Sequence, residues 1–410
     1  MKKVYVIDSK RSPIGKFLGS LYESNYVEVT NQVLNELFLE SNIDKNDIKN
    51  IIIGNVVSAG MGQGLARNIA ISAGLPVDSI AYSVNMVCGS GMKAIANAYQ
   101  EIQCGADVVL AGGVELMSNI PYATNSYIRL GKKFGDFTMT DLMVHDGLTD
   151  AFSGVHMGVT AENIAKHYNI TRQEQDEYAN LTQLRAINAV DDGKFKDEIV
   201  PIKLKDYKNN EYVFDTDEFP NRTSNLEKLT KLKPTFIKDG SGTVTAGNTS
   251  GINDGCAFVI LASEDYCRKN NLVPICELVS FANIGCDPQE MGLGPYYSIK
   301  KLLNNENMSL KDIDYLEINE AFAAQTLGCY KLLCDEYNIS KDELISKTNI
   351  YGSGIGLGHP LGCTGARLIT TLEHIMRKND CKYGIASLCI GGGMGIASLL
   401  RKVDTNEFTK

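Results

Sequence analysis

The sequence contains little that would mark an exported, membrane-embedded or metal-binding protein. No apolar run reaches the length of a membrane-spanning helix, and the apolar part of the opening stretch, MKKVYVIDSKR, is far shorter than the core of a signal peptide. The 11 cysteines are scattered, and no pair has the CxxC spacing of a metal or redox motif. A chain of this length also has no need of disulfide cross-links. We therefore expect a cytoplasmic protein with reduced thiols and no bound metal.

Positive charge is also scarce, because 40 lysines and arginines face 49 aspartates and glutamates, which gives a formal net charge of -9. This balance argues against non-specific binding to nucleic acid or to an anionic membrane. A phosphate-bearing ligand would need a local basic patch. Two clusters of basic residues stand in the middle of the chain: Arg129, Lys132 and Lys133, and then Arg222, Lys228, Lys231 and Lys233. The commoner meaning of such clusters is a solvated face.

The remaining composition is that of an ordinary globular protein, with 44% hydrophobic and 22% charged residues. At 410 residues the chain is too long to fold around one hydrophobic core. We therefore expect two or three domains.

The stretch NMVCGSGMKA (85–94) places Cys88 in a turn of small residues. The preceding IAYSVNMV (80–87) is typical of a strand, and a helical apolar spacing begins at Met92. This order would put Cys88 at a helix N-terminus, where free N–H groups and the helix dipole favour a thiolate. The glycines would also let a substrate carbonyl approach backbone donors. A buried structural cysteine is the alternative, and this stretch alone does not decide between the two.

Similar stretches recur in the same order toward the two ends of the chain. DIKNIIIGNVV (47–57) resembles DIDYLEINEAF (312–322), and the Cys88 turn resembles GSGIGLGHPLGCTGARLITTL (352–372). ADVVLAGGVELMS (106–118) resembles YGIASLCIGGGMGIASLL (383–400), and each is expected to be a buried strand that ends in glycines. The repeated order favours a duplicated α/β unit over the chance rhythm of an α/β chain.

The segment between these repeats, about 120–247, is richer in charge and breaks the rhythm. It contains helical patterns at 160–167 and 172–189 and a polar stretch at 203–225. Inserted segments on a rigid scaffold are the usual place for substrate-binding elements. We expect a loop domain here.

Three further polar residues stand in small-residue turns. Asn319 in NEAF follows a buried strand, His359 in GHPLG precedes a helix start, and Cys389 in CIGGGMG ends the last expected strand. Sheets of this class place ligands at the carboxyl ends of their strands. A pseudo-symmetric pair of halves would bring these turns and Cys88 together, which is stronger evidence for a site than one cysteine alone.

Six motifs together resemble those of the thiolase family, and most closely its short-chain, biosynthetic type. They are NMVCGSGMKA, HMGVTAEN (156–163), TAGNTSGINDG (245–255), NEAFA, GLGHPLGCTGAR and CIGGGMG. The resemblance runs from the first strand to Leu400. It implies a five-layered α-β-α-β-α fold made of two similar halves. The implied divisions are 1–119 with 248–270 for the first half, 120–247 for a loop domain, and 271–410 for the second half.

The resemblance also implies a role for each polar residue. Cys88 matches the nucleophile that takes the acyl group as a thioester, His359 the base that activates it, and Cys389 a second acid/base. A histidine titrates near neutral pH, which suits the role of base. The family uses two oxyanion sites. One would be formed by His359 and a water held by Asn319, and the other by the backbone N–H groups of Cys88 and Gly391.

Other positions match family residues that line the acyl pocket and the pantetheine tunnel. These are His156, Met157 and Ser250, with Leu148, Ala246 and Phe322 plausible in the same cleft. Met157 could instead be core packing, the commoner fate of methionine. Relatives commonly place an arginine directly after the proline of the EFPN stretch, near the adenine of coenzyme A. Here Asn221 stands at that place and Arg222 follows, so we assign the contact to Arg222.

The implied activity is the condensation of two acetyl-CoA molecules to acetoacetyl-CoA and coenzyme A, together with its reverse, through an acyl-cysteine. The ligands are coenzyme A thioesters and no cofactor is needed. A decarboxylating β-ketoacyl synthase is one alternative, although that group generally uses two histidines, or histidine and asparagine. A non-catalytic carrier of coenzyme A or lipid on the same scaffold is another.

Assembly and redox control are two further expectations. The family resemblance implies a homotetramer, with 126–137 as a contact loop, while a dimer stays open. If Cys88 and Cys389 face one substrate carbon, oxidation could join them as a disulfide and inactivate the enzyme.

Overall fold

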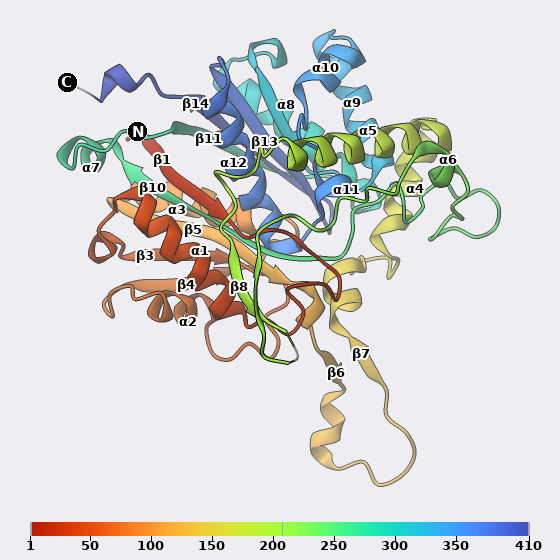
Figure 1. Ribbon diagram of the computed structural model, residues 1–410. Helices are drawn as coiled ribbons and strands as arrows, with labels where there is room; N and C mark the ends of the chain where they lie inside the picture. Colours follow the sequence, from red (N-terminus) through yellow and green to blue (C-terminus); the bar gives the residue numbers. More distant parts are fainter. Residues whose placement is uncertain (1, 207, 409–410) are drawn as a thin grey trace.

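The computed structural model describes residues 2–206 and 208–408 and shows two α/β halves that share one path of strands. The strand order is β12-β13-β14-β11-β1-β10-β5-β3-β4 (Figure 1). The strands of the first half are β1 (Val4–Arg11), β3 (Asn50–Gly54), β4 (Ile80–Val84), β5 (Val108–Leu116) and β10 (Asn253–Ser263). Those of the second half are β11 (Cys276–Gly285), β12 (Tyr315–Ile318), β13 (Tyr383–Ile390) and β14 (Met394–Lys402). The halves meet where β1 pairs with β11 over only two residue pairs.

The two halves repeat the same local order, as the sequence predicted. In the first half β3 pairs in parallel with β5, and in the second β12 pairs in parallel with β13. Helix α3 (Ser90–Gln103) follows the Cys88 turn, and α12 (Leu361–Lys378) follows the His359 turn. Strand β10 lies between β1 and β5, so a segment far along the chain completes the first half.

Helices α3 and α12 form the middle layer of five. They pack on each other and on strands of both halves, and an apolar cluster that includes Met92, Ile95, Leu368 and Ile369 fills the space around them. The outer layer of the first half contains α1 (Tyr26–Ser41), α2 (Leu65–Ser72) and α7 (Glu264–Lys269). That of the second contains α8 (Gly294–Glu306), α9 (Ala323–Tyr337) and α10 (Lys341–Lys347). A separate apolar cluster lies under each outer layer.

The two central helices touch at their N-termini through glycines. A Cβ on Gly91 would lie 2.7 Å from the carbonyl oxygen of Gly362, and a Cβ on Gly365 would lie 2.4 Å from the amide nitrogen of Met92. Backbone therefore packs directly against backbone at this crossing. Because Cys88 precedes α3 and His359 precedes α12, the same crossing brings both turns to one place.

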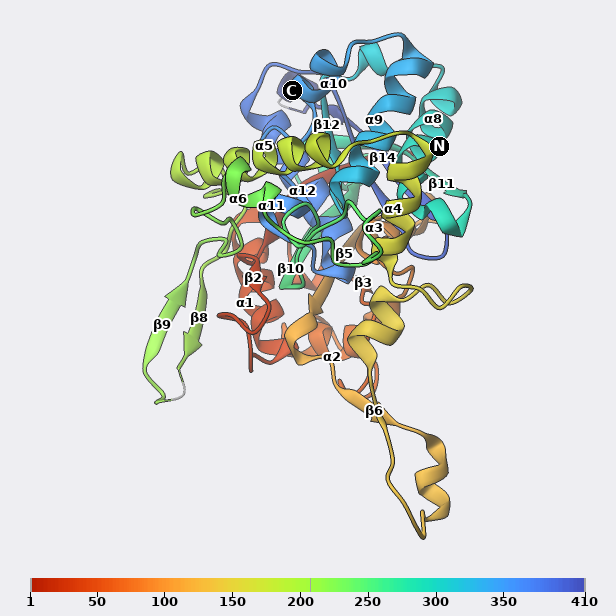
Figure 2. The ribbon, with the colours of Figure 1, turned by 90° about the vertical axis from the view of Figure 1, so that its right-hand side faces the viewer.

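The segment 120–247 wraps around this core. Its elements are β6 (Tyr122–Thr124), β7 (Met139–Asp141), a π-helical turn (Met143–Leu148), α4 (Met157–His167), α5 (Arg172–Asp191), β8 (Ile202–Lys205), β9 (Glu211–Phe214) and α6 (Leu226–Thr230). Two other short elements are β2 (Gly15–Lys16) and α11 (Gly354–Leu357). Strands β6 and β7 carry an arm that projects from the body, and β8–β9 form a second hairpin (Figure 2).

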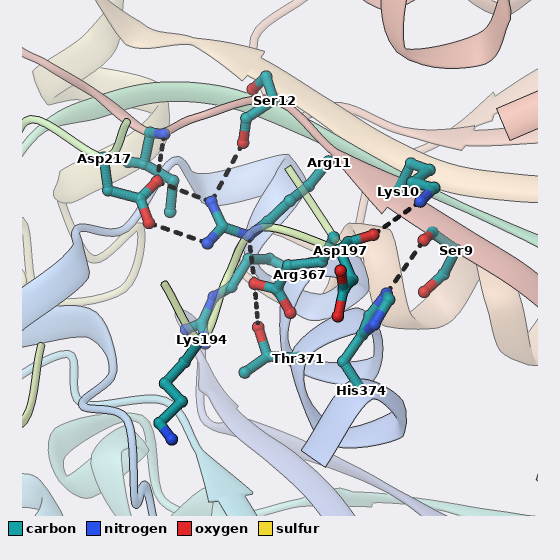
Figure 3. Close-up of polar contacts among 12 residues, drawn as sticks. Ser9, Lys10, Arg11, Ser12, Lys194, Asp197, Asp217, Arg367, Thr371 and His374 are labelled. Carbon is teal, nitrogen blue, oxygen red and sulfur yellow. Dashed lines mark hydrogen bonds and ion pairs between the residues drawn. The ribbon is translucent and has the colours of Figure 1, made fainter. Parts of the chain in front are cut away.

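Buried ion pairs tie this segment to β1. Arg11, fully buried, donates to both carboxylate oxygens of Asp217 at 2.7 and 2.8 Å and to Glu198 at 2.6 Å (Figure 3). Asp217 also accepts the backbone N–H of Ile14 at 2.7 Å. Buried charges need such partners, because an unpaired buried charge is costly.

Two expectations from the sequence were wrong in detail. Residues 383–400 form a hairpin rather than one strand, since Gly392 and Gly393 adopt positive φ and turn the chain back into β14. Cys389 therefore lies on the next-to-last strand, one residue before its end. The expected strand at 80–87 stops at Val84. Part of the β8–β9 hairpin lies in the polar stretch 203–225, for which no element was predicted.

Candidate active site

A cavity of about 260 Å³ lies between the two halves, next to the crossing of the central helices. Nine of the residues singled out in the sequence line it: Cys88, Leu148, His156, Met157, Ser250, Phe322, His359, Cys389 and Gly391. They come from both halves and from the segment 120–247, so the fold alone brings them together. Residues that the sequence did not single out also form its walls, among them Met117, Phe236, Ile252 and Met291. Phe236 stands directly after KLKPT, a stretch with two lysines. An aromatic residue in that setting could have been recognised from the sequence as a candidate for the cavity wall.

The turn that carries Cys88 is strained and held by polar side chains. Val87 has φ 45, a left-handed conformation that β-branched residues avoid. Asn85 Oδ1 accepts the N–H of Val87 at 3.0 Å, and the Ser90 hydroxyl donates to the carbonyl of Val87 at 2.6 Å. A Cβ on Gly89 would lie 2.4 Å from Ile390 Cδ1, so this turn packs closely on the end of β13.

Burial decides the protonation of Cys88. The cysteine lies against an apolar wall, and desolvation raises the pKa of its thiol to about 11. The backbone N–H groups of Gly391 and of Cys88 itself lower this pKa, but by less. The sequence-based expectation that the helix terminus would favour a thiolate was therefore wrong for the resting protein. The thiol is protonated at neutral pH.

His359 is also neutral at rest. Burial, followed by the charge of Arg367, lowers the pKa of its imidazole to about 3. Its Nδ1 lies 2.6 Å from the hydroxyl oxygen of Thr364, which itself donates to the carbonyl of Pro360 at 2.8 Å. That oxygen must accept from Nδ1–H, so the proton of the neutral ring is on Nδ1 and the lone pair is on Nε2.

Asn319 lies beside the free ring nitrogen of His359. It follows the end of β12, as predicted, and its Nδ2 is 3.4 Å from His359 Nε2. Its Oδ1 is buried and has no hydrogen-bond partner among the described residues. This oxygen lies against Gly354, where a Cβ would be 2.8 Å away, and Asn319 itself is not among the residues that line the cavity.

Cys389 and His156 complete the walls of the cavity. Burial raises the pKa of the Cys389 thiol well above its usual value, and the neighbouring Cys88 adds to this effect. His156 is the N-cap of α4, where its Nδ1 accepts the N–H of Gly158 at 3.0 Å, and its ring stacks on Phe236 at 4.6 Å. Met157 both lines the cavity and belongs to a hydrophobic core cluster, so both interpretations of this residue hold.

A second, wider pocket of about 830 Å³ adjoins the cavity and shares Thr249 with it. Arg222 and Ala246, both predicted to contact the ligand, line this second pocket, together with Lys16 and Lys228. The guanidinium of Arg222 also pairs with both carboxylate oxygens of Asp191, at 2.6 and 2.9 Å. The two pockets together offer a narrow apolar end and a wider end that also contains charged side chains.

Three histidines lie outside the site. His145 and His167 are exposed, and His374 is buried in α12 and faces the carbonyl of Ser9 (Figure 3). No group of three histidine, cysteine or acidic residues in the described part of the chain could hold a metal ion. Among the same residues, no helix has both the length and the apolar character needed to cross a membrane.

Comparison with known proteins identifies the family to which this chain is similar. The N-terminal domain of thiolase matches residues 4–265 and its C-terminal domain matches residues 272–402. An acetyl-CoA acetyltransferase of Allochromatium vinosum is 43% identical over 98% of this chain and 100% of its own.

Solved structures agree with this comparison. The acetyl-CoA acetyltransferase of Syntrophomonas wolfei superposes with a TM-score of 0.94 at 41% identity, over 98% of this chain and 100% of that one. The human mitochondrial 3-ketoacyl-CoA thiolase superposes with a TM-score of 0.91 at 38% identity, over 98% and 99%. The chain, with its duplicated halves and its cavity between two cysteine turns, belongs to the thiolase family.

Proposed function

We propose that this protein is an acetyl-CoA C-acetyltransferase, an enzyme that condenses two acetyl-CoA molecules to acetoacetyl-CoA and coenzyme A and also catalyses the reverse thiolysis. The observation that carries the proposal is the convergence of Cys88, His359 and Cys389 on one small apolar cavity. Such a cavity suits a short acyl group, and the adjoining wider pocket suits the rest of a coenzyme A thioester.

The first half-reaction transfers an acetyl group to Cys88. Because the thiol and the imidazole are both neutral at rest, the proton moves from Cys88 to His359 Nε2 as the sulfur attacks, rather than beforehand. Backbone N–H groups of Cys88 and Gly391 bind the oxygen that becomes negative. Cys389 gives its proton to the departing coenzyme A sulfur. This step leaves acetyl-Cys88, a protonated His359 and a Cys389 thiolate.

The second half-reaction forms the carbon–carbon bond. The Cys389 thiolate takes a proton from the α-carbon of a second acetyl-CoA, and the protonated Nε2 of His359 stabilises the enolate oxygen with a water held by Asn319. The enolate carbon attacks acetyl-Cys88 and releases acetoacetyl-CoA. The Cys88 sulfur then recovers its proton from His359, so both cysteines and the histidine return to their resting states. No cofactor takes part.

The substrate contacts follow from the two pockets. Leu148, His156, Met157, Ser250 and Phe322 would surround the acyl group and the pantetheine, while Ala246 and Arg222 would contact the nucleotide end. Lys16 and Lys228 add positive charge to the wider pocket, which suits the phosphates of coenzyme A. The carboxylates of Asp217 and Glu218 line the same pocket, and that of Asp217 is paired with Arg11.

A test of the proposal is the thiolysis of acetoacetyl-CoA by the protein and by Cys88→Ala. We expect thiolysis in the wild type, none in the variant, and an acetyl adduct on Cys88 by mass spectrometry after incubation with acetyl-CoA. Cys104→Ala is the matched control, because Cys104 is an exposed free thiol outside the site. An acetyl adduct that persists in Cys88→Ala would overturn the assignment.

The same assays separate the alternatives. Activity with malonyl thioesters but not with acetyl-CoA would indicate a decarboxylating condensing enzyme, and binding of coenzyme A without turnover would indicate a carrier. Comparison of acetoacetyl-CoA with longer 3-ketoacyl-CoAs would define the chain-length range. We expect the short substrate to be preferred, since the cavity of about 260 Å³ is small and has Met157 and Met291 in its wall.

We further propose a homotetramer in the cytoplasm. Two surfaces support the assembly: the β6–β7 arm, which exposes aromatic side chains, and the free edge of β4, where Ile80 and Tyr82 are exposed. All 11 cysteines are free thiols, which suits a reducing compartment.

A further inference from the structure

A buried carboxylate on β5, Glu115, lies between the two turns that carry the reacting groups. Its side chain is fully buried, and no cation pairs with it among the described residues. It accepts four hydrogen bonds, all from N–H groups: Asn55 Nδ2 at 3.1 Å, Val56 N at 2.9 Å, Val57 N at 3.2 Å and Gly362 N at 3.0 Å. The mechanism described above does not use this group.

The hydrogen bonds of Glu115 reach the cysteine turn through one side chain. The loop after β3 donates to Glu115 through Val56, and Asn85 Nδ2 in turn donates to the carbonyl of Val56 at 3.0 Å. The Oδ1 of the same asparagine accepts the N–H of Val87, the strained residue before Cys88. Strain of this kind persists only where the surroundings enforce it.

On the opposite side, Glu115 reaches the histidine turn directly. Gly362 is the second residue of α12 and lies three positions after His359. Its N–H is one of the free donors of the helix N-terminus, and a Cβ at this position would lie 2.6 Å from Glu115 Oε2. The carboxylate therefore fixes how close the start of α12 comes to β5.

We propose that Glu115 is a positioning residue that holds the Cys88 turn and the His359 turn in register for proton transfer. The Glu115 side chain accepts from four N–H donors that belong to two segments of the chain. Because both of its oxygens must accept, a carboxylate suits this place better than any neutral side chain. A glutamine would turn an amide toward either the pair Asn55 and Val57 or the pair Val56 and Gly362. The proposal deepens the function proposed above, and its experiment also has a readout that is independent of that function.

The test is a double-mutant cycle that measures the alkylation of Cys88 by iodoacetamide. Mass spectrometry follows the rate of alkylation at each cysteine, and the exposed Cys104 serves as internal reference. In the wild-type background His359→Asn should slow alkylation of Cys88, since the base is lost. In Glu115→Gln the same change should have an effect below about twofold, because the base is already misplaced. An undiminished effect of His359→Asn in Glu115→Gln would overturn the proposal.

Turnover supplies the second readout. In Glu115→Gln we expect kcat for acetoacetyl-CoA thiolysis to fall about 10- to 100-fold, with KM changed by less than about threefold. Glu373→Gln is the matched control, since Glu373 is equally buried but lies in α12 away from both turns. It should keep the kcat and the alkylation behaviour of the wild type. Wild-type kcat in folded Glu115→Gln would also overturn the proposal.

A milder variant covers the case in which Glu115→Gln does not fold. Asn85→Ala keeps the carboxylate and removes only the link between Val56 and Val87. It should weaken the dependence of Cys88 alkylation on His359 in the same direction, and full dependence would contradict the proposal. The wild type could show no thiolysis while Glu115→Gln still removes the effect of His359→Asn on Cys88 alkylation. In that case the proposed function fails and the positioning role stands.

Discussion

Burial fixes the resting state of both reacting groups at the level of single residues. The pKa of the Cys88 thiol is raised to about 11 and that of His359 is lowered to about 3, so neither group is charged at neutral pH. A preformed thiolate–imidazolium pair is therefore disfavoured. The proton therefore moves to His359 only as the sulfur attacks an electrophile, and with a thioester the backbone N–H groups bind the oxygen that becomes negative.

Thr364 determines which ring nitrogen of His359 is free to accept the proton from the Cys88 thiol. Its hydroxyl oxygen lies 2.6 Å from Nδ1 and its proton is used on Pro360. Thr364→Val keeps the shape but removes this acceptor. We expect kcat for thiolysis to fall about five- to tenfold, the effect of losing roughly 1 kcal/mol of hydrogen bonding, with KM little changed.

Thr370→Val is the matched control for this variant. Thr370 is another buried threonine of α12, and its hydroxyl has no hydrogen-bond partner among the described residues. It should keep wild-type kcat and lose no stability. Equal losses of kcat in the two variants would show that Thr364 acts only through helix packing.

The sequence predicted that Cys88, His359 and Cys389 would meet at one cavity, but it did not predict their protonation. Each of these residues stands in or just before a run of small residues that are adjacent in the chain. Their pKa values depend instead on surrounding atoms from distant segments, such as Ile390 against Gly89. Helix-terminus arguments from the sequence omit this desolvation, which is the larger effect at Cys88.

At the level of elements, local patterns predicted the strands and helices of the repeats, while the turns between them were harder. The 383–400 stretch is apolar and glycine-rich throughout, so no polar residue marks the turn at Gly392 and Gly393. The β8–β9 hairpin lies in a polar stretch because it packs few of its side chains, and Tyr212 and Val213 are exposed. Hydrophobic periodicity in a sequence detects elements that bury one face. The hairpin at 383–400 and the β8–β9 hairpin do not show this periodicity.

The β6–β7 arm offers an element-scale test of the proposed tetramer (Figure 2). It exposes large apolar side chains far from the body, including Leu130 at 83% and Phe134 at 90%. A patch of this kind usually contacts a partner. The double variant Leu130→Asp with Phe134→Asp should shift the mass measured by light scattering from tetramer to dimer, because the β4 edge is untouched.

Leu39→Asp is the control for the arm variant, since Leu39 is 71% exposed on α1 but isolated from the arm. It should leave the tetramer intact. A wild-type tetramer in the arm variant would exclude this surface from the assembly, and a monomeric wild type would exclude the tetramer itself.

At the scale of the whole molecule, the duplication was predictable because both halves keep the same order of motifs. The buried charges that join the segment 120–247 to the core were not. Arg11, Glu198 and Asp217 stand far apart in the sequence, and each alone is typical of a solvated surface. Only the folded chain brings them together, as the contacts between Arg11 and Asp217 show (Figure 3), and Asp217 also lines the wider pocket.

The buried carboxyl group of Glu373, which accepts a hydrogen bond from Ser9, should make the stability of the protein depend on pH. Burial, with smaller contributions from the carboxylates of Asp8 and Glu198, raises the pKa of Glu373 to about 8 against the lowering effects of Arg377 and the Ser9 hydroxyl. In the unfolded chain the group ionises near 4.5. Between these values the unfolded chain has released a proton that the folded protein retains, so this carboxyl lowers stability as pH rises from about 4.5 to 8.

Glu373→Gln removes this titration, so the melting temperature of the variant relative to wild type should rise across the same window. We expect the difference to grow by at least about 3 °C between pH 5 and pH 9, measured by scanning fluorimetry in matched buffers. Glu227→Gln is the matched control, since the Glu227 side chain on α6 is 78% exposed, and its melting temperature relative to wild type should not follow this trend. A difference for Glu373→Gln that stays constant over this range would mean that Glu373 titrates at an ordinary pH in the folded protein, and that its buried neighbours stabilise the charge.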